Sequence, residues 1–242
     1  MRLVTPPGVF APISDSRLLA AHLMAERPDA RTRVLDLCTG SGYLAVAAAQ
    51  AGAGDVTAVD LSRRAVLSAR VNARLNGVRV RALRGDLLEP VRGERFDLIV
   101  ANPPYVPAAD DGLRARGPAR AWAAGRNGRA LLDQVLAQAP SALAPGGSLL
   151  VVHSSVCGED PTLDRLRAAG LGVEVLERVR GPLGPLMRER ADMLVARGLL
   201  SGGARGEEEV LVIAGRAGRA SVEADGARGG DPHPAHAQGL RA

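Results

Sequence analysis

The 242-residue sequence contains no lysine, so all 31 of its basic residues are arginine. It has only two cysteines, which excludes a small secreted scaffold held together by disulfides. Aromatic residues make up 2% of the chain, so the core must be built from Leu, Val, Ile and Ala. Hydrophobic residues reach 46% and charged residues 24%, a balance that is typical, at this length, of one globular α/β domain.

The formal net charge is +5, but the arginines are scattered and interleaved with Asp and Glu. This distribution does not predict a basic patch on the surface, so the charge pattern gives little support to a nucleic-acid partner. Leu37–Gly54 carries no charge, yet its polar residues and glycines leave too short an apolar part to span a membrane. Prolines interrupt Met1–Leu23, which therefore lacks an apolar signal core. We expect no membrane partner and a location in the cytoplasm.

Short apolar runs alternate with helical patterns along the chain. The runs typical of strands are Arg33–Leu37, Asp55–Asp60, Val78–Leu83, Phe96–Ala101, Ser148–Val152, Val173–Val179 and Glu208–Ala214. The helical patterns are Ser14–Glu26, Tyr43–Ala51, Ser62–Asn76, Asn127–Leu143, Thr162–Ala169 and Leu186–Arg197. Such alternation over short connections predicts a Rossmann-like, doubly wound α/β fold. Its seven-stranded sheet should be mostly parallel, with the last two strands forming an antiparallel hairpin at the edge.

The same patterns divide the chain into three regions. Residues 1–32 form an extended N-terminal lead-in and a helix, and residues 33–215 form the α/β domain. Residues 216–242 are rich in Gly, Ala and Arg without an apolar period, so we expect a disordered tail. Val106–Ala124 is expected to be a loop, and Pro145–Gly147 a turn.

A glycine-rich turn follows the first expected strand. Asp36 ends that strand, and Gly40 and Gly42 allow a ligand to approach the backbone closely where the next helix begins. A nicotinamide enzyme would need the spacing G-x-G-x-x-G, but Cys38 occupies the first glycine position and the spacing after Gly42 differs. This turn therefore predicts a cofactor site, for which a nicotinamide dehydrogenase stays open as the less favoured alternative.

Acidic residues lie at the end of the second expected strand and shortly after the third. Asp60 lies about 20 residues beyond the glycine turn, where a carboxylate can accept both hydroxyls of a ribose. Asp86 follows the third strand and is placed to hold an adenine amino group, with Leu87 packing on the ring. Either residue taken alone is also compatible with an ordinary capping or turn aspartate.

The fourth strand runs directly into Asn102-Pro103-Pro104-Tyr105. The two prolines stiffen the backbone and remove two donors. The side-chain oxygen of Asn102 and the carbonyl of Pro103 can then serve as fixed acceptors, and Tyr105 offers a flat face. We expect these three residues to hold a planar NH₂ group and to be the catalytic ones, and we expect Asn102 to contact the cofactor as well.

These motifs, in this order, resemble those of the HemK-type release-factor glutamine methyltransferases, in the short form without a helical N-terminal domain. Phe10–Ser16 resembles the entry motif of that form, in which an aromatic residue and a Ser or Thr contact the cofactor. The resemblance extends from Gly8 to Val152, and Ala121–Gly128 resembles the segment before the fourth helix. Cys38 replaces the usual glycine, so its backbone should face the methionine part, and Phe10 stands where the family usually has Tyr.

The resemblance implies that residues 33–215 are a methyltransferase domain that uses S-adenosylmethionine. It implies a glutamine amide as acceptor, in a protein such as a translation release factor, and a small activator subunit as a possible partner. An adenine-N6 methyltransferase, a small-molecule methyltransferase and a non-catalytic cofactor-binding module remain alternatives. No His or Cys cluster has metal-ligand spacing, so we expect no metal.

Overall fold

The computed structural model describes residues 1–109, 124–201, 203 and 206–219. Most of the expected loop Val106–Ala124, and the expected tail after Arg219, lie outside the described residues.

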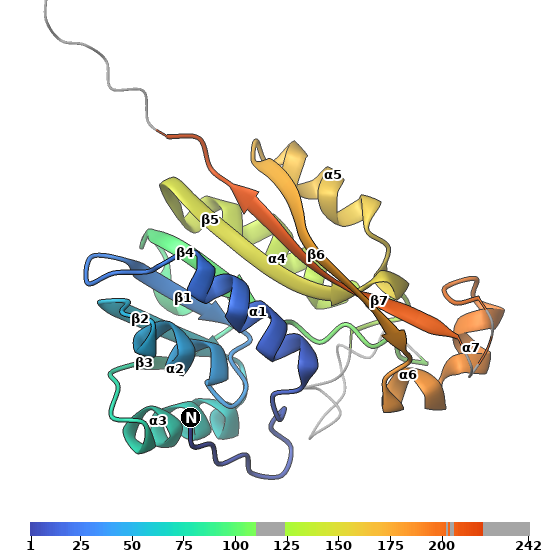
Figure 1. Ribbon diagram of the computed structural model, residues 1–242, viewed down its shortest axis with the longest axis horizontal. Coiled ribbons are helices and arrows are strands. Elements are labelled where there is room, and N and C mark those ends of the chain that lie inside the picture. Colours follow the sequence, from blue (N-terminus) through green and yellow to red (C-terminus); the bar gives the residue numbers. More distant parts are fainter. Residues whose placement is uncertain (110–123, 202, 204–205, 220–242) are drawn as a thin grey trace, which may run out of the picture.

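In the described residues, seven strands form one sheet in the order β3-β2-β1-β4-β5-β7-β6 (Figure 1). The strands are β1 (Arg33–Leu37), β2 (Asp55–Asp60), β3 (Arg81–Arg84), β4 (Phe96–Ala101), β5 (Leu143–Ser154), β6 (Gly172–Pro182) and β7 (Glu207–Arg216). β1 to β5 pair in parallel, whereas β7 pairs antiparallel with both β5 and β6. The expected doubly wound, mostly parallel sheet with an antiparallel edge hairpin is confirmed.

Helices cover both faces of the sheet (Figure 1). They are α1 (Ser14–Ala25), α2 (Tyr43–Gln50), α3 (Arg63–Leu75), α4 (Ala130–Gln138), α5 (Asp160–Ala168), α6 (Pro185–Glu189) and α7 (Ala191–Ala196), with short 3₁₀ turns at Glu89–Val91, Ala139–Ala142 and Ser155–Cys157. α1, α2 and α3 pack on the face that includes Val34 and Leu150, and α4 and α5 pack on the face that includes Leu35 and Leu149. Successive strand residues thus point to opposite layers, and both layers are apolar.

Four sequence-based boundaries were wrong. The third strand begins at Arg81 rather than Val78. Val78 still belongs to the C-terminal end of α3, because its N–H donates to the Ala73 carbonyl. The helix expected over 127–143 is shorter because Gly128 adopts φ +77° and Pro140 turns its end into a 3₁₀ turn.

The expected turn Pro145–Gly147 lies inside β5, which extends from Leu143 to Ser154. The single helix expected over 186–197 is two short helices, because Arg190 leaves the helical region at φ −106°.

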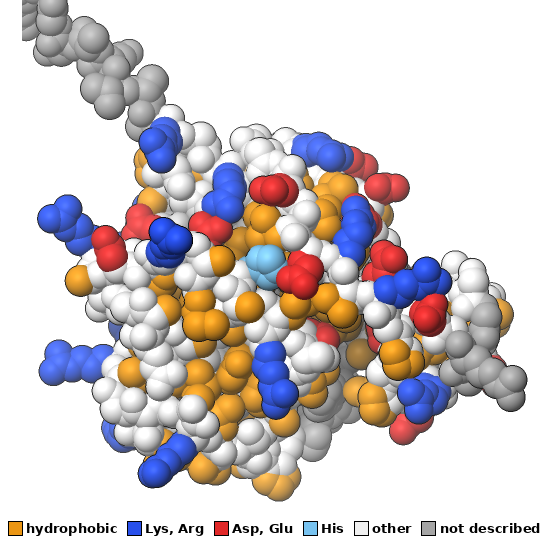
Figure 2. All heavy atoms as spheres, in the orientation of Figure 1, with side chains coloured by type: hydrophobic (Ala, Val, Ile, Leu, Met, Phe, Trp, Pro, Cys, Tyr) orange, Lys and Arg blue, Asp and Glu red, His pale blue; other side chains and the backbone are white. Residues whose placement is uncertain are grey.

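The surface agrees with the scattered charge pattern of the sequence. On the face shown in Figure 2, Arg side chains are separated from one another by Asp, Glu and uncharged side chains. None of the helices in the described part of the chain is long and apolar enough to cross a membrane.

We predict that Gly42→Ala lowers the free energy of unfolding by about 2–5 kcal/mol, through strained backbone and overpacking. Gly42 adopts φ +82°, and an added Cβ would lie 2.7 Å from the Ala69 Cα on α3. Gly77→Ala is the matched control, since Gly77 adopts φ +67° but its Cβ would meet no described atom within 4 Å. The control should lose only about 1–2 kcal/mol. Urea denaturation measures both, and equal losses would contradict the proposed clash.

Candidate active site

A cavity of about 1050 Å³ lies at the carboxyl ends of β1, β2 and β4. The sheet register explains its position, because Leu37 pairs with Val59 on one side and with Ala101 on the other. The residues that follow these three therefore meet at one edge of the sheet. The cavity is lined by these residues predicted from the sequence: Phe10, Ser16, Cys38, Gly40, Asp60, Asp86, Leu87, Asn102, Pro103 and Tyr105.

The carboxylate of Asp60 is held by the glycine turn. Its Oδ2 accepts a hydrogen bond from the Gly40 N–H at 2.9 Å, and its Oδ1 accepts one from the Ser62 N–H at 2.8 Å. Burial raises the pKa of Asp60, although these backbone donors act in the opposite direction. Each oxygen retains a lone pair, so the oriented carboxylate can still accept hydroxyl groups of a ligand.

The backbone of the turn is left-handed at every second residue, with φ +59° at Cys38, +54° at Gly40 and +82° at Gly42. Phe10 packs on this turn from the N-terminal lead-in, since a Cβ on Gly40 would lie 3.6 Å from the Phe10 Cβ. Burial raises the pKa of the Cys38 thiol well above its usual value, with Asp60 and Asp36 adding to the effect. The thiol therefore stays protonated and is unsuited to act as a nucleophile.

Asp36 and Gly42 do not line the cavity, unlike the other predicted site residues. Asp36 is fully buried below the turn, where its Oδ2 accepts from the Thr39 hydroxyl at 2.5 Å and from the Ala45 N–H at 3.0 Å. Burial raises the pKa of Asp36 to about 7. Gly42 packs against α3. Both residues shape the turn from beneath it.

Leu87 and Asp86 form the wall next to β3. Leu87 is buried at φ +45°, and Asp86 is exposed beside it. The short turn Glu89–Val91 begins here, with the Glu89 N–H donating to the Asp86 carbonyl at 2.9 Å. Asp86 and Leu87 thus line the cavity side by side, and their contact with an adenine ring stays a prediction.

Asn102 is oriented by a residue that lies 86 positions earlier in the chain. Its Nδ2 donates to the hydroxyl of Ser16, on α1, at 3.1 Å. This contact leaves the Asn102 Oδ1 as the acceptor of the amide. Ser16 was predicted to contact the cofactor, and its hydroxyl hydrogen remains a donor that can serve that role as well.

The hydroxyl of Tyr105 donates to the Asp15 carboxylate, which also accepts from the Ser14 hydroxyl at 2.9 Å. Burial and the nearby Asp15 raise the pKa of Tyr105 well above its usual value. Tyr105 is thus a protonated, fixed ring rather than a base. Asp15 was not predicted as a site residue, although its position next to Ser16 in the entry motif was a usable signal.

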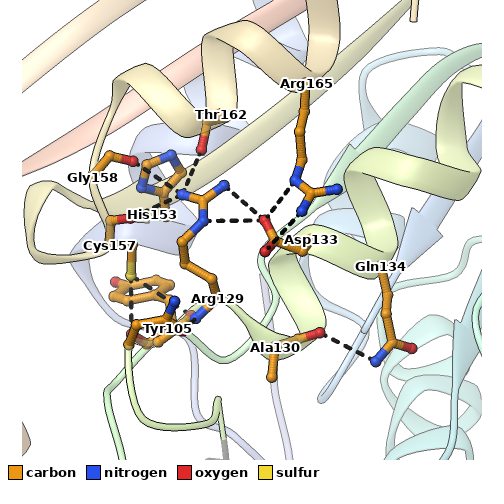
Figure 3. Close-up of polar contacts among 12 residues, drawn as sticks. Tyr105, Arg129, Ala130, Asp133, Gln134, His153, Cys157, Gly158, Thr162 and Arg165 are labelled. Carbon is orange, nitrogen blue, oxygen red and sulfur yellow. Dashed lines mark hydrogen bonds and ion pairs between the residues drawn. The ribbon is translucent and has the colours of Figure 1, made fainter. Parts of the chain in front are cut away.

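A buried arginine supports the chain behind Tyr105 (Figure 3). Arg129 donates to the carbonyls of Cys157 and Gly158 at 2.9 and 3.1 Å and pairs with Asp133 at 2.8 Å. The Cys157 thiol in turn donates to the Tyr105 carbonyl at 3.2 Å. Nothing in the sequence pattern distinguished Arg129 from the other arginines, because its role depends on the turn that follows β5.

The far end of the cavity is formed by the edge hairpin and α6, including Pro182, Met187 and Glu208. Glu208 accepts from the Gly184 N–H at 2.9 Å and from the Ser154 hydroxyl at 2.5 Å. No role was predicted from the sequence for this region. Among the described residues, no group of three or more His, Cys, Asp or Glu side chains could hold a metal ion.

The chain is similar in sequence to known proteins. A family model described as the methyltransferase small domain matches residues 1–115. A candidate protein N5-glutamine methyltransferase of Methanocaldococcus jannaschii is 35% identical over 188 residues, which cover 77% of this chain and 93% of the relative. A release factor glutamine methyltransferase of Geobacter sulfurreducens is 38% identical over 154 residues, covering 61% of this chain and 54% of the relative. This chain thus spans about half the length of the bacterial relative.

Among solved structures, the E. cuniculi Mtq2–Trm112 complex, responsible for methylation of the eRF1 translation termination factor, is similar in fold. Its TM-score is 0.59 at 24% identity, and the match covers 87% of this chain and 99% of that one. The archaeal match covers most of both sequences at an identity well above chance. The chain therefore belongs to the protein N5-glutamine methyltransferase family, whose members use S-adenosylmethionine as methyl donor.

Proposed function

We propose that this enzyme methylates the side-chain amide nitrogen of a glutamine in a protein acceptor, most simply a translation release factor in the cytoplasm. The observation that carries the proposal is the Asn102 amide, whose nitrogen is occupied by Ser16 so that its oxygen is left to accept from an NH₂ group. The archaeal and bacterial relatives are named for the same reaction.

The residues of the cavity fit S-adenosylmethionine. Asp60 would accept the ribose hydroxyls, Asp86 and Leu87 would hold the adenine, and the backbone of Cys38 and Gly40 would lie along the methionine part. Asp60 supports this fit because two backbone donors already orient it. Ligand pockets commonly enclose about 300–1,000 Å³, so a cavity of about 1050 Å³ has room for the cofactor and an acceptor side chain. When bound, this cofactor supplies a methyl group activated by its positive sulfur.

Asn102 and Pro103 act on the nucleophile. An amide nitrogen is a poor nucleophile because its lone pair is delocalised, so the enzyme must orient it and favour a pyramidal geometry. The Asn102 Oδ1 and the Pro103 carbonyl would each accept one hydrogen of the acceptor NH₂. Both hydrogen bonds strengthen as positive charge develops on the nitrogen, which stabilises the transition state more than the ground state.

Tyr105 would stack on the planar amide of the acceptor and fix its orientation. Holding two reactants in near-attack geometry can contribute about 7–11 kcal/mol to lowering a barrier. No general base is required, because the methylated nitrogen is briefly a strongly acidic cation and loses its proton to water. This is consistent with a Tyr105 hydroxyl that burial keeps protonated.

The alternative acceptor is adenine, whose exocyclic amine presents the same NH₂ to the same oxygens, and a small-molecule amide is a further alternative. The names of the relatives favour glutamine. A small activator subunit is part of the proposal, because the structurally similar E. cuniculi protein is in complex with Trm112.

Asn102→Ala is expected to lower kcat by roughly 10²–10³-fold, the loss typical of removing one preorganised hydrogen-bonding group at a reaction centre. The Kd for S-adenosylmethionine should stay nearly unchanged, since Asn102 acts on the nucleophile. Calorimetric titration and single-turnover assays separate the two quantities. A parallel loss of cofactor affinity would mean that Asn102 serves mainly the cofactor.

Asp60→Ala should show the opposite pattern. Hydrogen bonds to a charged group contribute about 1.5–3 kcal/mol, so the Kd for S-adenosylmethionine is expected to rise roughly 10- to 100-fold. Asp55→Ala is the control, because Asp55 begins the same strand and its exposed carboxylate pairs with Arg33 at 3.2 Å, away from the cavity. An unchanged Kd in the Asp60 variant would remove it as the ribose ligand.

The acceptor is tested with labelled S-adenosylmethionine and cell extract, with and without a candidate activator subunit. Label released by protease, and recovered after exhaustive enzymatic digestion to amino acids as N5-methylglutamine, is the expected result. Label released only by nuclease would replace the glutamine proposal with the adenine one. Label that passes a small-pore filter without digestion, in a product separated by chromatography from the labelled cofactor, would indicate a small-molecule acceptor.

A further inference from the structure

Four polar side chains recur at intervals of four residues along α3 and its end: Arg64, Ser68, Asn72 and Asn76. This spacing places them in one row on the helix surface. Each of them is hydrogen-bonded to the backbone of residues 2–7 in the N-terminal lead-in. Residues 2–10 are called the N-terminal strap below, and Figure 1 shows the N-terminus beside α3.

The two asparagines hold the strap in the way that a neighbouring strand would. Asn76 accepts from the Arg2 N–H at 2.8 Å and donates to the Arg2 carbonyl at 2.7 Å. Asn72 does the same with Val4, at 2.7 and 3.0 Å. Ser68 adds a hydrogen bond to the Val4 carbonyl at 2.7 Å. Both the N–H and the C=O of alternate strap residues are thus paired by side chains.

The spacing of the side chains along α3 matches the spacing of the residues along the strap. Four residues of an α-helix rise about 6 Å, and two residues of an extended chain rise about 6.6 Å. Residues Asn76 and Asn72 can therefore reach Arg2 and Val4 in turn, as the strap runs antiparallel to the helix. Arg64 continues the row by donating to the Pro7 carbonyl at 3.2 Å.

The strap leads directly into the cavity wall. After a turn in which the Val9 N–H donates to the Pro6 carbonyl at 3.1 Å, Phe10 packs over the glycine turn at Gly40. The fully buried Asn72 also donates to the carbonyl of Ser41, in the glycine turn itself, at 2.8 Å. One side chain thus connects the strap, α3 and the turn that faces the cavity.

We propose that Ser68, Asn72 and Asn76 are positioning residues for cofactor binding: they pin the strap to α3 so that Phe10 closes one wall of the cavity. None of the three lines the cavity, so they act only through the strap and the glycine turn. The inference rests on the proposed function for the identity of the ligand. If the strap is released, the wall formed by Gly8, Val9 and Phe10 is lost, and only the pinned fraction of molecules binds tightly.

The test uses the full chain with the double substitution Ser68→Ala/Asn76→Ala. Asn72 is left intact because its removal would also disturb the glycine turn. A neutral hydrogen bond contributes about 0.5–1.5 kcal/mol, so the loss of the pinning contacts should raise the KM and Kd for S-adenosylmethionine roughly three- to tenfold. kcat at saturating cofactor should be unchanged. The amides of Arg2 and Val4 should exchange hydrogen faster than in the wild type.

Leu67→Ala/Leu75→Ala is the matched control. These residues directly precede the two substituted positions on the same helix, but their side chains are 62% and 45% exposed. The control should keep the wild-type KM and the wild-type exchange of the strap. A fall in kcat in the double variant, or an equal rise in KM in the control, would overturn the proposal.

Two further outcomes separate this proposal from the proposed function. Faster exchange of the strap with an unchanged KM, in an enzyme that binds S-adenosylmethionine, overturns the positioning role alone. A wild-type protein without affinity for S-adenosylmethionine overturns the proposed function, and the positioning role falls with it.

Discussion

The parallel pairing of β1 with both β2 and β4 is the constraint on which the site depends. Its register places Leu37 beside Val59 and Ala101, so the three strands end together. The glycine turn, the Asp60 carboxylate and the Asn102 amide then share one edge without any further adjustment. A shift of one residue in either pairing would turn Asp60 or Asn102 to the opposite face of the sheet.

Elements distant in the sequence contribute side chains to the site at the strand ends. α1 contributes Ser16 to orient Asn102 and Asp15 to hold Tyr105, and these pairs lie 86 and 90 residues apart. The placement of α1 on the sheet is secured by apolar packing, since Leu19 and Leu23 are fully buried. Apolar burial thus places the polar groups that orient the two candidate catalytic side chains.

Hydrogen bonds to the backbone are the means by which this protein shapes its loops. Arg129 holds the turn behind Tyr105, Asn72 holds the strap and the glycine turn, and Asp36 holds the glycine turn from below. A buried polar group costs free energy unless it is paired. These residues therefore hold the surrounding backbone in the arrangement that pairs them, and that arrangement also forms the cavity.

The sequence by itself determined the order and type of the elements and the chemistry of the strand ends. The short apolar runs of the strands, the glycine turn and the Asn-Pro-Pro-Tyr segment are local patterns, and local patterns report local structure. Boundaries at Arg81 and Arg190 were wrong because helix closure and tertiary packing decided them. The partners of Asn102 and Tyr105, the position of Asp36 beneath the turn and the row of side chains on α3 were decided only by the tertiary structure. Each depends on contacts between segments far apart in the chain, which no local pattern encodes.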